Sequence, residues 1–236
     1  MSTEVKSRLE FVQNQIRQTC LRSGRSESSV KLIAVSKLKP VADLVAAVQA
    51  GVQDLGENYV QEWREKKESW PTSVPFPRWH LIGPLQTNKV KNVVGQVDWI
   101  HSVDREELAQ EISKRACSLG IRQKILIQLN IGDEETKHGV SLSDAQGFLL
   151  RICELPGLEI AGLMALPPLS DDEQIARGYF RQVTSRRAQW IQSHPRLEPL
   201  LRELSLGTSG DFLWAIQEGA TMVRVGTAIF GAREKT

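Results

Sequence analysis

The feature that most constrains the fold is an alternation of short apolar segments with helical segments, which repeats eight times along the chain. The apolar segments are predicted to be β-strands, and they lie at Lys31–Val35, Asp54–Gly56, Trp79–Ile82, Trp99–His101, Lys124–Leu129, Leu158–Ala165, Glu203–Leu206 and Met222–Val225. Their near-continuous apolar character is typical of parallel strands that are covered on both faces. Eight strand–helix repeats therefore predict an α/β protein that closes into a (β/α)8 TIM-type barrel. An open doubly wound sheet is the alternative.

Helices are predicted after seven of these strands. They begin near Pro40, Asn58, Gln86, Asp104, Ser143, Glu173 and Asp211. Asp104 and Glu107 have the spacing of a capping box, and the charges of Gln61–Glu68 are expected on a solvated helix face. The eighth helix, near Thr227–Phe230, would be very short.

The first 24 residues are predicted to form an additional amphipathic helix. Val5, Leu9, Val12 and Ile16 recur at helical spacing among charged and polar residues. We expect this helix to pack on the barrel and to cover the surface that the very short eighth helix leaves bare. Residues 1–236 are predicted to be a single domain, because no linker-like or low-complexity stretch divides them.

Composition argues against several classes of protein. The chain has 30 Lys and Arg against 28 Asp and Glu, interspersed along its length, so nucleic acid is not an expected partner. No segment approaches the roughly 18 apolar residues of a membrane span or resembles a signal peptide, so no membrane association is expected. Cys20, Cys117 and Cys153 show no CxxC spacing and are interpreted as reduced thiols of a cytoplasmic protein. His80 and His101 lack a second ligand at metal spacing, which favours packing or a mouth-lining role and no metal.

Two loops near the C-terminus have the composition of a phosphate site. Each follows an apolar strand and is rich in Gly, Ser and Thr, within residues 204–211 and 222–231. Such loops expose backbone N–H groups, and a helix start adds partial positive charge. The usual phosphate site of a barrel lies in the loops after strands seven and eight, which are these two. Asp211 would repel a phosphate and is expected to point away and cap its own helix.

Lys37 and Arg224 are the charged residues expected at the C-terminal mouth of the barrel, where these two loops lie. Lys37 follows the first strand, and Arg224 lies within the adjacent eighth strand. A nearby cation and partial burial disfavour an ammonium form, so Lys37 is a candidate nucleophile toward a phosphorylated aldehyde. Pyridoxal 5′-phosphate (PLP) and sugar phosphates are both such aldehydes. Inside the barrel Arg224 needs an acceptor, which is either a carboxylate such as Glu57 or a pyridine nitrogen that it would keep unprotonated.

The residues around these positions closely resemble the pyridoxal phosphate homeostasis protein family. The resemblance covers nearly the whole chain in register. It rests on Ala34–Lys37, Gly56–Glu62, His80–Lys89, Asn130 with Glu135–Gly139, Gly162–Met164, Leu204–Ser209 and Val223–Gly231. It implies a fold-type III PLP barrel, similar to the N-terminal domain of alanine racemases.

The cofactor-binding residues that the resemblance implies are Lys37, Asn58, Met164, Ser205, Ser209, Arg224, Gly226 and Thr227. The lysine would carry PLP as a covalent Schiff base, and the arginine would face the pyridine nitrogen. The serines, the glycine and the threonine would hold the phosphate. The asparagine and the methionine would line the ring.

The resemblance further implies a role in PLP homeostasis, through storage, delivery or buffering of the cofactor, without evident catalytic turnover. A racemase-like enzyme acting on amino acids is the alternative. It would need acid/base groups on both faces of the substrate carbon, and of the two tyrosines only Tyr59 could approach the mouth. A Schiff-base aldolase acting on a sugar phosphate is a third possibility. Apo forms of PLP-dependent enzymes are expected as recipients, and a monomer is expected because one chain supplies the whole mouth.

Overall fold

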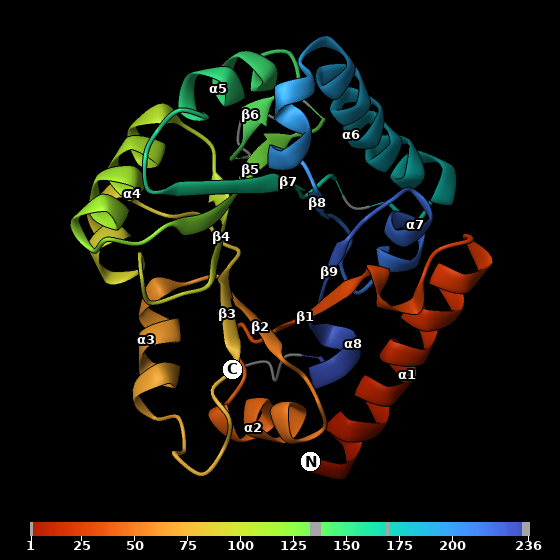
Figure 1. The fold of residues 1–236 in the computed structure, drawn as a ribbon. Helices are drawn as coiled ribbons and strands as arrows, with labels where there is room; N and C mark the ends of the chain where they lie inside the picture. The colour runs from red at the N-terminus through yellow and green to blue at the C-terminus, as the bar shows by residue number, and fades with distance from the viewer. Residues whose placement is uncertain (1, 133–137, 169, 233–236) are drawn as a thin grey trace.

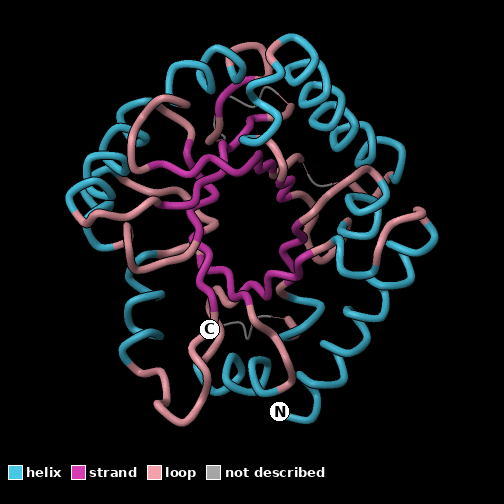
Figure 2. Tube along the Cα trace, viewed as in Figure 1, coloured by secondary structure: helices cyan, strands magenta, loops and turns pink. Residues whose placement is uncertain are grey.

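The computed structural model describes residues 2–132, 138–168 and 170–232, and its centre is a ring of parallel strands. The ring strands are β1 Lys31–Val35, β2 Asp54–Glu57, β3 Arg78–Leu81, β4 Trp99–Val103, β5 Gln123–Asn130, β7 Leu158–Ala165, β8 Glu203–Ser205 and β9 Met222–Val225. They pair in the order β4-β3-β2-β1-β9-β8-β7-β5, and pairing between β4 and β5 closes the ring (Figure 2). The predicted TIM-type barrel is confirmed, and its closure rules out an open sheet.

The sequence pattern does not predict the remaining strand. β6, Val140–Ser141, pairs with Leu129 and Asn130 at the end of β5 and lies outside the closed ring. A strand of two residues is too short to produce a periodic apolar pattern.

Helices surround the barrel (Figure 1). The α-helices are α1 Ser2–Arg22, α2 Val41–Gln49, α3 Val60–Glu68, α4 Glu106–Ser118, α5 Ala145–Ile152, α6 Glu173–Ser193, α7 Phe212–Gln217 and α8 Thr227–Phe230, and the 3₁₀ helices are Glu27–Ser29, Thr87–Asn92 and Pro195–Leu200. The segment after β3, predicted as a helix from Gln86, is thus a 3₁₀ helix; its threonine and two asparagines have low α-helix propensity. Across the described ranges, no helix combines the length and the apolar character needed to cross a bilayer.

The predicted capping box at α4 is wrong. The helix begins one residue later than the capping-box spacing requires, so that Arg105 occupies the N-cap position without a side-chain cap. The Asp104 carboxylate instead accepts a hydrogen bond from Arg105 Nη1 at 2.8 Å. An ion pair with the neighbouring residue has therefore replaced the cap.

α1 packs along one side of the barrel, against α2, α7 and α8 (Figure 1). Its apolar stripe of Val5, Leu9, Val12 and Ile16 is buried. α8 is a single turn, and α1 lies against it at the point where a longer eighth helix would otherwise cover the sheet. That residues 1–236 form one domain stays a prediction.

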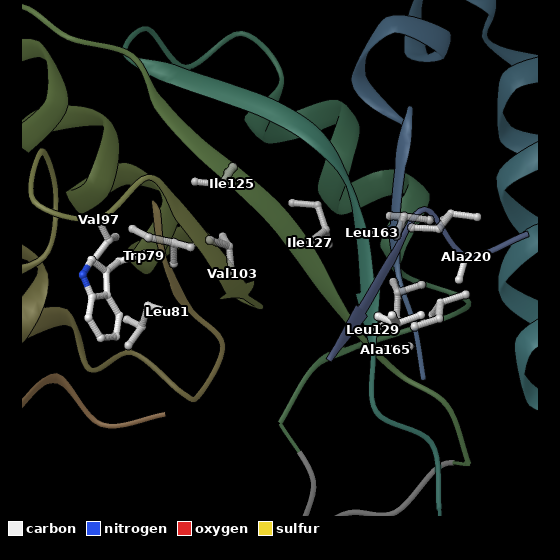
Figure 3. Close-up of a cluster of buried hydrophobic side chains, with 14 of the residues drawn as sticks. Trp79, Leu81, Val97, Val103, Ile125, Ile127, Leu129, Leu163, Ala165 and Ala220 are labelled. Carbon is white, nitrogen blue, oxygen red and sulfur yellow. The ribbon is translucent and has the colours of Figure 1, made fainter. Parts of the chain in front are cut away.

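Two apolar clusters occupy the two faces of the sheet. The larger cluster lies between the sheet and the helices, and Figure 3 shows part of it, with Ile125 and Ile127 on β5 and Leu163 on β7. The smaller cluster alternates with these residues along the strands and therefore faces the lumen. Its members are Ile33, Trp99, Leu126, Met164 and Met222. Buried polar residues share this lumen, and they lead to the pocket described next.

Candidate cofactor-binding site

A pocket of about 530 Å³ opens at the carboxyl ends of the barrel strands. It is lined by Val35, Lys37, Asn58, Ile82, Met164, Leu166, Pro167, Thr208, Ser209, Arg224, Gly226 and Thr227. Seven of the eight predicted site residues therefore lie around one cavity, and Ser205 is the exception. The volume is within the roughly 300–1,000 Å³ typical of small-molecule sites, and the mouth is where barrel proteins place their chemistry.

Lys37 stands in a tight turn just after β1. The next residue, Leu38, has a left-handed φ of 58°, and its N–H donates to Glu62 Oε1 at 2.6 Å. On the other side of the turn, the Ser36 carbonyl accepts from Lys66 Nζ at 2.7 Å. A left-handed leucine is unfavourable by itself. The two bonds to α3 therefore hold the turn that carries Lys37 to the pocket.

α3 contributes a buried lysine to this arrangement. Lys66 is only 5% exposed, and its Nζ lies 2.6 Å from both Glu57 Oε2 and Glu62 Oε1. The prediction of a solvated face over Gln61–Glu68 is wrong at this residue. Spacing of four residues puts Glu62 and Lys66 on one side of the helix, and that side meets the end of β2. Burial raises the pKa of the Glu57 carboxyl, and the nearby Lys66 ammonium opposes this.

Arg224 reaches the pocket from the lumen and is 5% exposed. Its Nη1 donates to the carbonyl and hydroxyl oxygens of Ser205 at 2.6 and 2.7 Å, and its Nη2 donates to the Ala165 carbonyl at 2.8 Å. The alternative ion pair with Glu57 is wrong, since that carboxylate pairs with the lysine of α3. Burial lowers the pKa of the guanidinium to about 10, which leaves it charged at neutral pH. A guanidinium has five N–H groups, so two remain for an acceptor in the pocket.

Ser205, the last residue of β8, lies below the pocket and not on its wall. Its side chain is fully buried, accepts the bond from Arg224 and lies 3.1 Å from His101 Nδ1. A contact between this hydroxyl and a phosphate stays a prediction. The bonds described here connect the hydroxyl to the arginine and to the lumen.

Ser209, Gly226 and Thr227 lie together where the loops after β8 and β9 meet. Ser209 Oγ accepts from the N–H of Gly226 at 3.1 Å and from that of Ala228 at 3.4 Å. These bonds occupy the lone pairs of the hydroxyl and leave its proton available for the pocket. Because α8 is one turn long, the donors here act as individual groups with little support from a helix dipole.

Asp211 does not cap α7, contrary to expectation. Its Oδ1 accepts from the N–H of Thr208 at 2.5 Å and from Thr208 Oγ1 at 3.0 Å. The side chain turns back toward the loop and braces it from within. The Thr208 N–H is therefore committed to this carboxylate and not to a ligand.

Asn58 is held from two sides. Its N–H donates to Glu57 Oε1 at 2.8 Å, and Gly83 packs on its backbone so closely that a Cβ there would lie 2.3 Å from the Asn58 carbonyl oxygen. Asn58 Oδ1 is buried and has no hydrogen-bond partner among the described residues. Because buried polar atoms are normally satisfied, this oxygen indicates a donor on a ligand. Met164, on β7, is 3% exposed and lines the pocket from the lumen cluster.

Five lining residues lie outside the predicted set: Val35, Ile82, Leu166, Pro167 and Thr208. The first two stand at the carboxyl ends of predicted strands, a position that could have identified them. The third and fourth belong to a proline-rich segment interpreted as a connection, and their residue types carry no chemical signal. The fifth lies inside one of the family segments.

Other candidate residues lie away from the pocket. Tyr59 is 53% exposed and lines a neighbouring groove. His80 and His101 are fully buried in the lumen and lie 2.9 Å apart, so neither lines the mouth. Within the described parts of the chain, no three His, Cys, Asp or Glu residues could hold one metal ion. The family segment Glu135–Gly139 falls mostly on residues 133–137, outside the described residues.

Comparisons with known proteins identify relatives of the whole chain and structures with the same fold. The chain matches the family "Alanine racemase, N-terminal domain" over residues 12–234. A pyridoxal phosphate homeostasis protein of Aquifex aeolicus is 41% identical over 227 residues, which cover 96% of this chain and 97% of that protein. The structure of PipY from Synechococcus elongatus PCC7942 with PLP bound has a TM-score of 0.82 at 36% identity and covers 96% of this chain and 100% of that one. Clostridium difficile alanine racemase shares the fold alone, with a TM-score of 0.71 at 15% identity over 97% of this chain and 57% of its own.

Proposed function

Because the chain belongs to the pyridoxal phosphate homeostasis protein family, we propose that it binds PLP at the barrel mouth and acts in PLP homeostasis. The supporting observation is that Lys37 and Arg224 line one pocket together with Ser209, Gly226 and Thr227. An amine, a buried charged donor and a set of hydroxyl and N–H groups correspond to the aldehyde, the ring nitrogen and the phosphate of PLP. Storage, delivery or buffering of the cofactor is the role we assign to this binding.

Lys37 provides the amine in this proposal. Bound PLP supplies an aldehyde that condenses with an amine and releases water. The bonds from α3 to Ser36 and Leu38 keep the Lys37 turn at the pocket edge. Arg224 directs its remaining N–H groups at the ring nitrogen. Since the guanidinium stays charged, it donates a hydrogen bond without surrendering a proton, and the ring nitrogen remains unprotonated.

The other lining residues bind and orient the cofactor. The Ser209 hydroxyl and the N–H group of Thr227 hold the phosphate, and Gly226, whose N–H donates to Ser209 Oγ, positions that hydroxyl. Asn58 Oδ1 accepts a hydrogen bond from a donor on the ring. Met164 contacts the ring and excludes water on the lumen side.

The acid/base groups that line the pocket support a non-catalytic role. Racemisation requires one such group on each face of the substrate carbon. Among the lining residues, the titratable side chains are Lys37 and Arg224, and the second stays protonated. Tyr59 faces the neighbouring groove. Racemase-like activity is the alternative, apo PLP-dependent enzymes are the proposed recipients, and a monomeric state stays a prediction.

Covalent trapping tests the binding site. The purified protein incubated with PLP should show a visible absorption band, and borohydride should fix the cofactor to the peptide that contains Lys37. Lys37→Ala should lose this labelling. Lys39→Ala is the matched control, because its Nζ bonds to the carbonyls of Phe230 and Ala232 outside the pocket. Equal labelling of Lys37→Ala refutes the assignment, and a colourless protein that instead takes a sugar phosphate favours an aldolase.

Hydrogen exchange at the Cα of amino acids tests the non-catalytic role. PLP-loaded protein is incubated with D- or L-alanine in deuterated buffer, and deuterium at Cα is measured by mass spectrometry. Exchange no faster than with the Lys37→Ala protein is expected, because the described residues that line the pocket offer Lys37 as their one proton-exchanging group. Rapid exchange with loss of optical purity would establish the racemase-like alternative.

A further inference from the structure

A chain of hydrogen bonds runs through the barrel lumen from Arg224 to the opposite end of the strands. Arg224 Nη1 donates to Ser205 Oγ, which lies 3.1 Å from His101 Nδ1. His101 Nε2 lies 2.9 Å from His80 Nδ1, and His80 Nε2 lies 2.9 Å from Asp54 Oδ1. These side chains come from β9, β8, β4, β3 and β2. All five residues of this hydrogen-bond chain are buried, and each is at most 5% exposed.

The far end of the chain determines the direction of every bond. Arg78 donates to both oxygens of Asp54, at 2.8 and 2.7 Å. Burial by itself would raise the pKa of Asp54, but the hydrogen bonds from Arg78 and His80 outweigh it, so the pKa lies below its usual range. Asp54 is therefore a carboxylate that only accepts, and His80 Nε2 must carry the proton that is donated to it. A neutral His80 then accepts at Nδ1 from His101 Nε2–H.

The same reasoning continues to the pocket. A neutral His101 has a lone pair at Nδ1, so it accepts from the Ser205 hydroxyl. The oxygen of Ser205 is then the acceptor for Arg224, as its distance and geometry require. All hydrogens in the chain thus point away from the pocket and toward Asp54. Nowhere in this chain of hydrogen bonds do two donors or two acceptors face each other.

The surroundings keep both histidines neutral. Burial lowers the pKa of His80 although Asp54 opposes this, and burial together with neighbouring positive charge lowers the pKa of His101 well below its usual range. The ionisable groups that act on the pair from outside it are Asp54, Asp98, Lys31 and Arg224. Trp99 stacks on His80, with ring planes 3° apart, and fixes the orientation of that imidazole.

We propose that Ser205, His101, His80 and Asp54 are positioning residues that hold Arg224 at the cofactor's ring nitrogen through a one-directional hydrogen-bond chain. The inference rests on the proposed function for the identity of the ligand. In this arrangement the Ser205 hydroxyl points away from the pocket, and the neutral histidines have no spare proton to pass toward it. Arg224 is left as the donor at the ring nitrogen, with its guanidinium plane fixed by the carbonyls of Ser205 and Ala165.

The direction of the chain is measurable without PLP. Long-range ¹H–¹⁵N NMR spectra of the ligand-free protein should show His80 and His101 as neutral rings protonated at Nε2, unchanged between pH 6 and 8. A ring protonated at Nδ1, or an imidazolium signal from either buried histidine, overturns the one-directional chain even if PLP binds at Lys37.

Variants at position 101 test the effect on the cofactor. His101→Phe removes both bonds and should shift the visible band of bound PLP and weaken binding about tenfold, as expected for lost positioning of a charged donor. His101→Asn keeps an acceptor beside Ser205 and should restore most of the wild-type band. Ser102→Ala is the matched control, since this neighbouring buried hydroxyl on β4 has no hydrogen-bond partner among the described residues.

The outcomes separate the two proposals. A wild-type band and affinity in His101→Phe, or an equal change in Ser102→Ala, overturns the positioning role. Failure of the wild-type protein to take up PLP at Lys37 refutes the proposed function and with it the cofactor part of this inference. The NMR spectra still decide the direction of the chain in that case.

Discussion

Replacing Lys66 by methionine should destabilise the protein strongly, because it leaves a buried charge without its partner. Methionine retains most of the side-chain length but cannot bond to Ser36, Glu57 or Glu62. The Glu57 carboxylate is fully buried, and breaking a buried pair by removing one partner costs about 3–5 kcal/mol. For a domain of this size that corresponds to a fall in Tm of roughly 10 °C. PLP binding should also weaken, since the turn carrying Lys37 loses an anchor.

The destabilisation by Lys66→Met should also depend on pH. The pKa of Glu57 is already raised in the folded protein by burial, and losing the lysine ammonium raises it further. A carboxyl with a raised folded pKa contributes stability below its unfolded value of 4.5 and loses it as the pH rises through the folded pKa. The penalty of Lys66→Met should therefore be smaller at pH 5 than at pH 7, because protonation of Glu57 removes the unpaired charge.

Urea unfolding followed by circular dichroism measures these effects. Lys114→Met is the matched control, an exposed lysine on α4 that should change the free energy of unfolding by less than about 0.5 kcal/mol. The double variant Glu57→Gln/Lys66→Met should be more stable than Lys66→Met alone, since neither charge remains. If Lys66→Met costs no more than Lys114→Met, the reasoning from burial fails.

Two further substitutions test the site and the lumen. Gly83→Ala should lower the free energy of unfolding by about 1–3 kcal/mol and weaken PLP binding, because the new Cβ would lie 2.3 Å from the Asn58 carbonyl oxygen. Gly178→Ala is the control, since its Cβ would meet open space, and it should leave binding unchanged in a PLP titration. Equal binding by both variants would contradict this packing. In the folded protein, hydrogen bonds to the Asp54 carboxylate outweigh burial and lower its pKa. The carboxylate therefore stabilises the fold above its unfolded pKa of 3.8, and this stabilisation is lost as the pH falls below that value. Asp54→Asn should accordingly flatten the acid limb of the curve of stability against pH. The exposed Asp171→Asn should keep the wild-type acid limb in the same thermal melts, and identical curves for the two variants would refute the assignment.

Local patterns were sufficient for the barrel, and the family resemblance named most of the residues that line the pocket. The eight strands show as apolar runs because parallel strands are covered on both faces, and Lys37 and Arg224 stand out by their positions at the end of one run and inside another. Boundaries were less accurate. The cap of α4 differs from its prediction because Asp104 pairs with Arg105 instead, a competition that spacing alone does not rank.

The sequence missed residues whose role depends on distant partners. Lys66 has the spacing of an ordinary surface pair with Glu62, and only the approach of β2 buries it against Glu57. Likewise, nothing near His101 in sequence identifies Ser205, which lies 104 positions away. Periodicity reports which face of an element is apolar, but it does not report which polar side chains meet inside.

By itself, the sequence determined the closed barrel, and its resemblance to a known family named seven of the twelve residues that line the pocket. These depend on repeats and motifs whose residues are close together in the chain. Only the tertiary structure decided that Arg224 bonds to Ser205 and Ala165 instead of a carboxylate, and that two histidines connect it to Asp54. Hydrogen bonds require atoms within about 3 Å of each other, and in this protein closure of the ring brings side chains from five different strands to that distance.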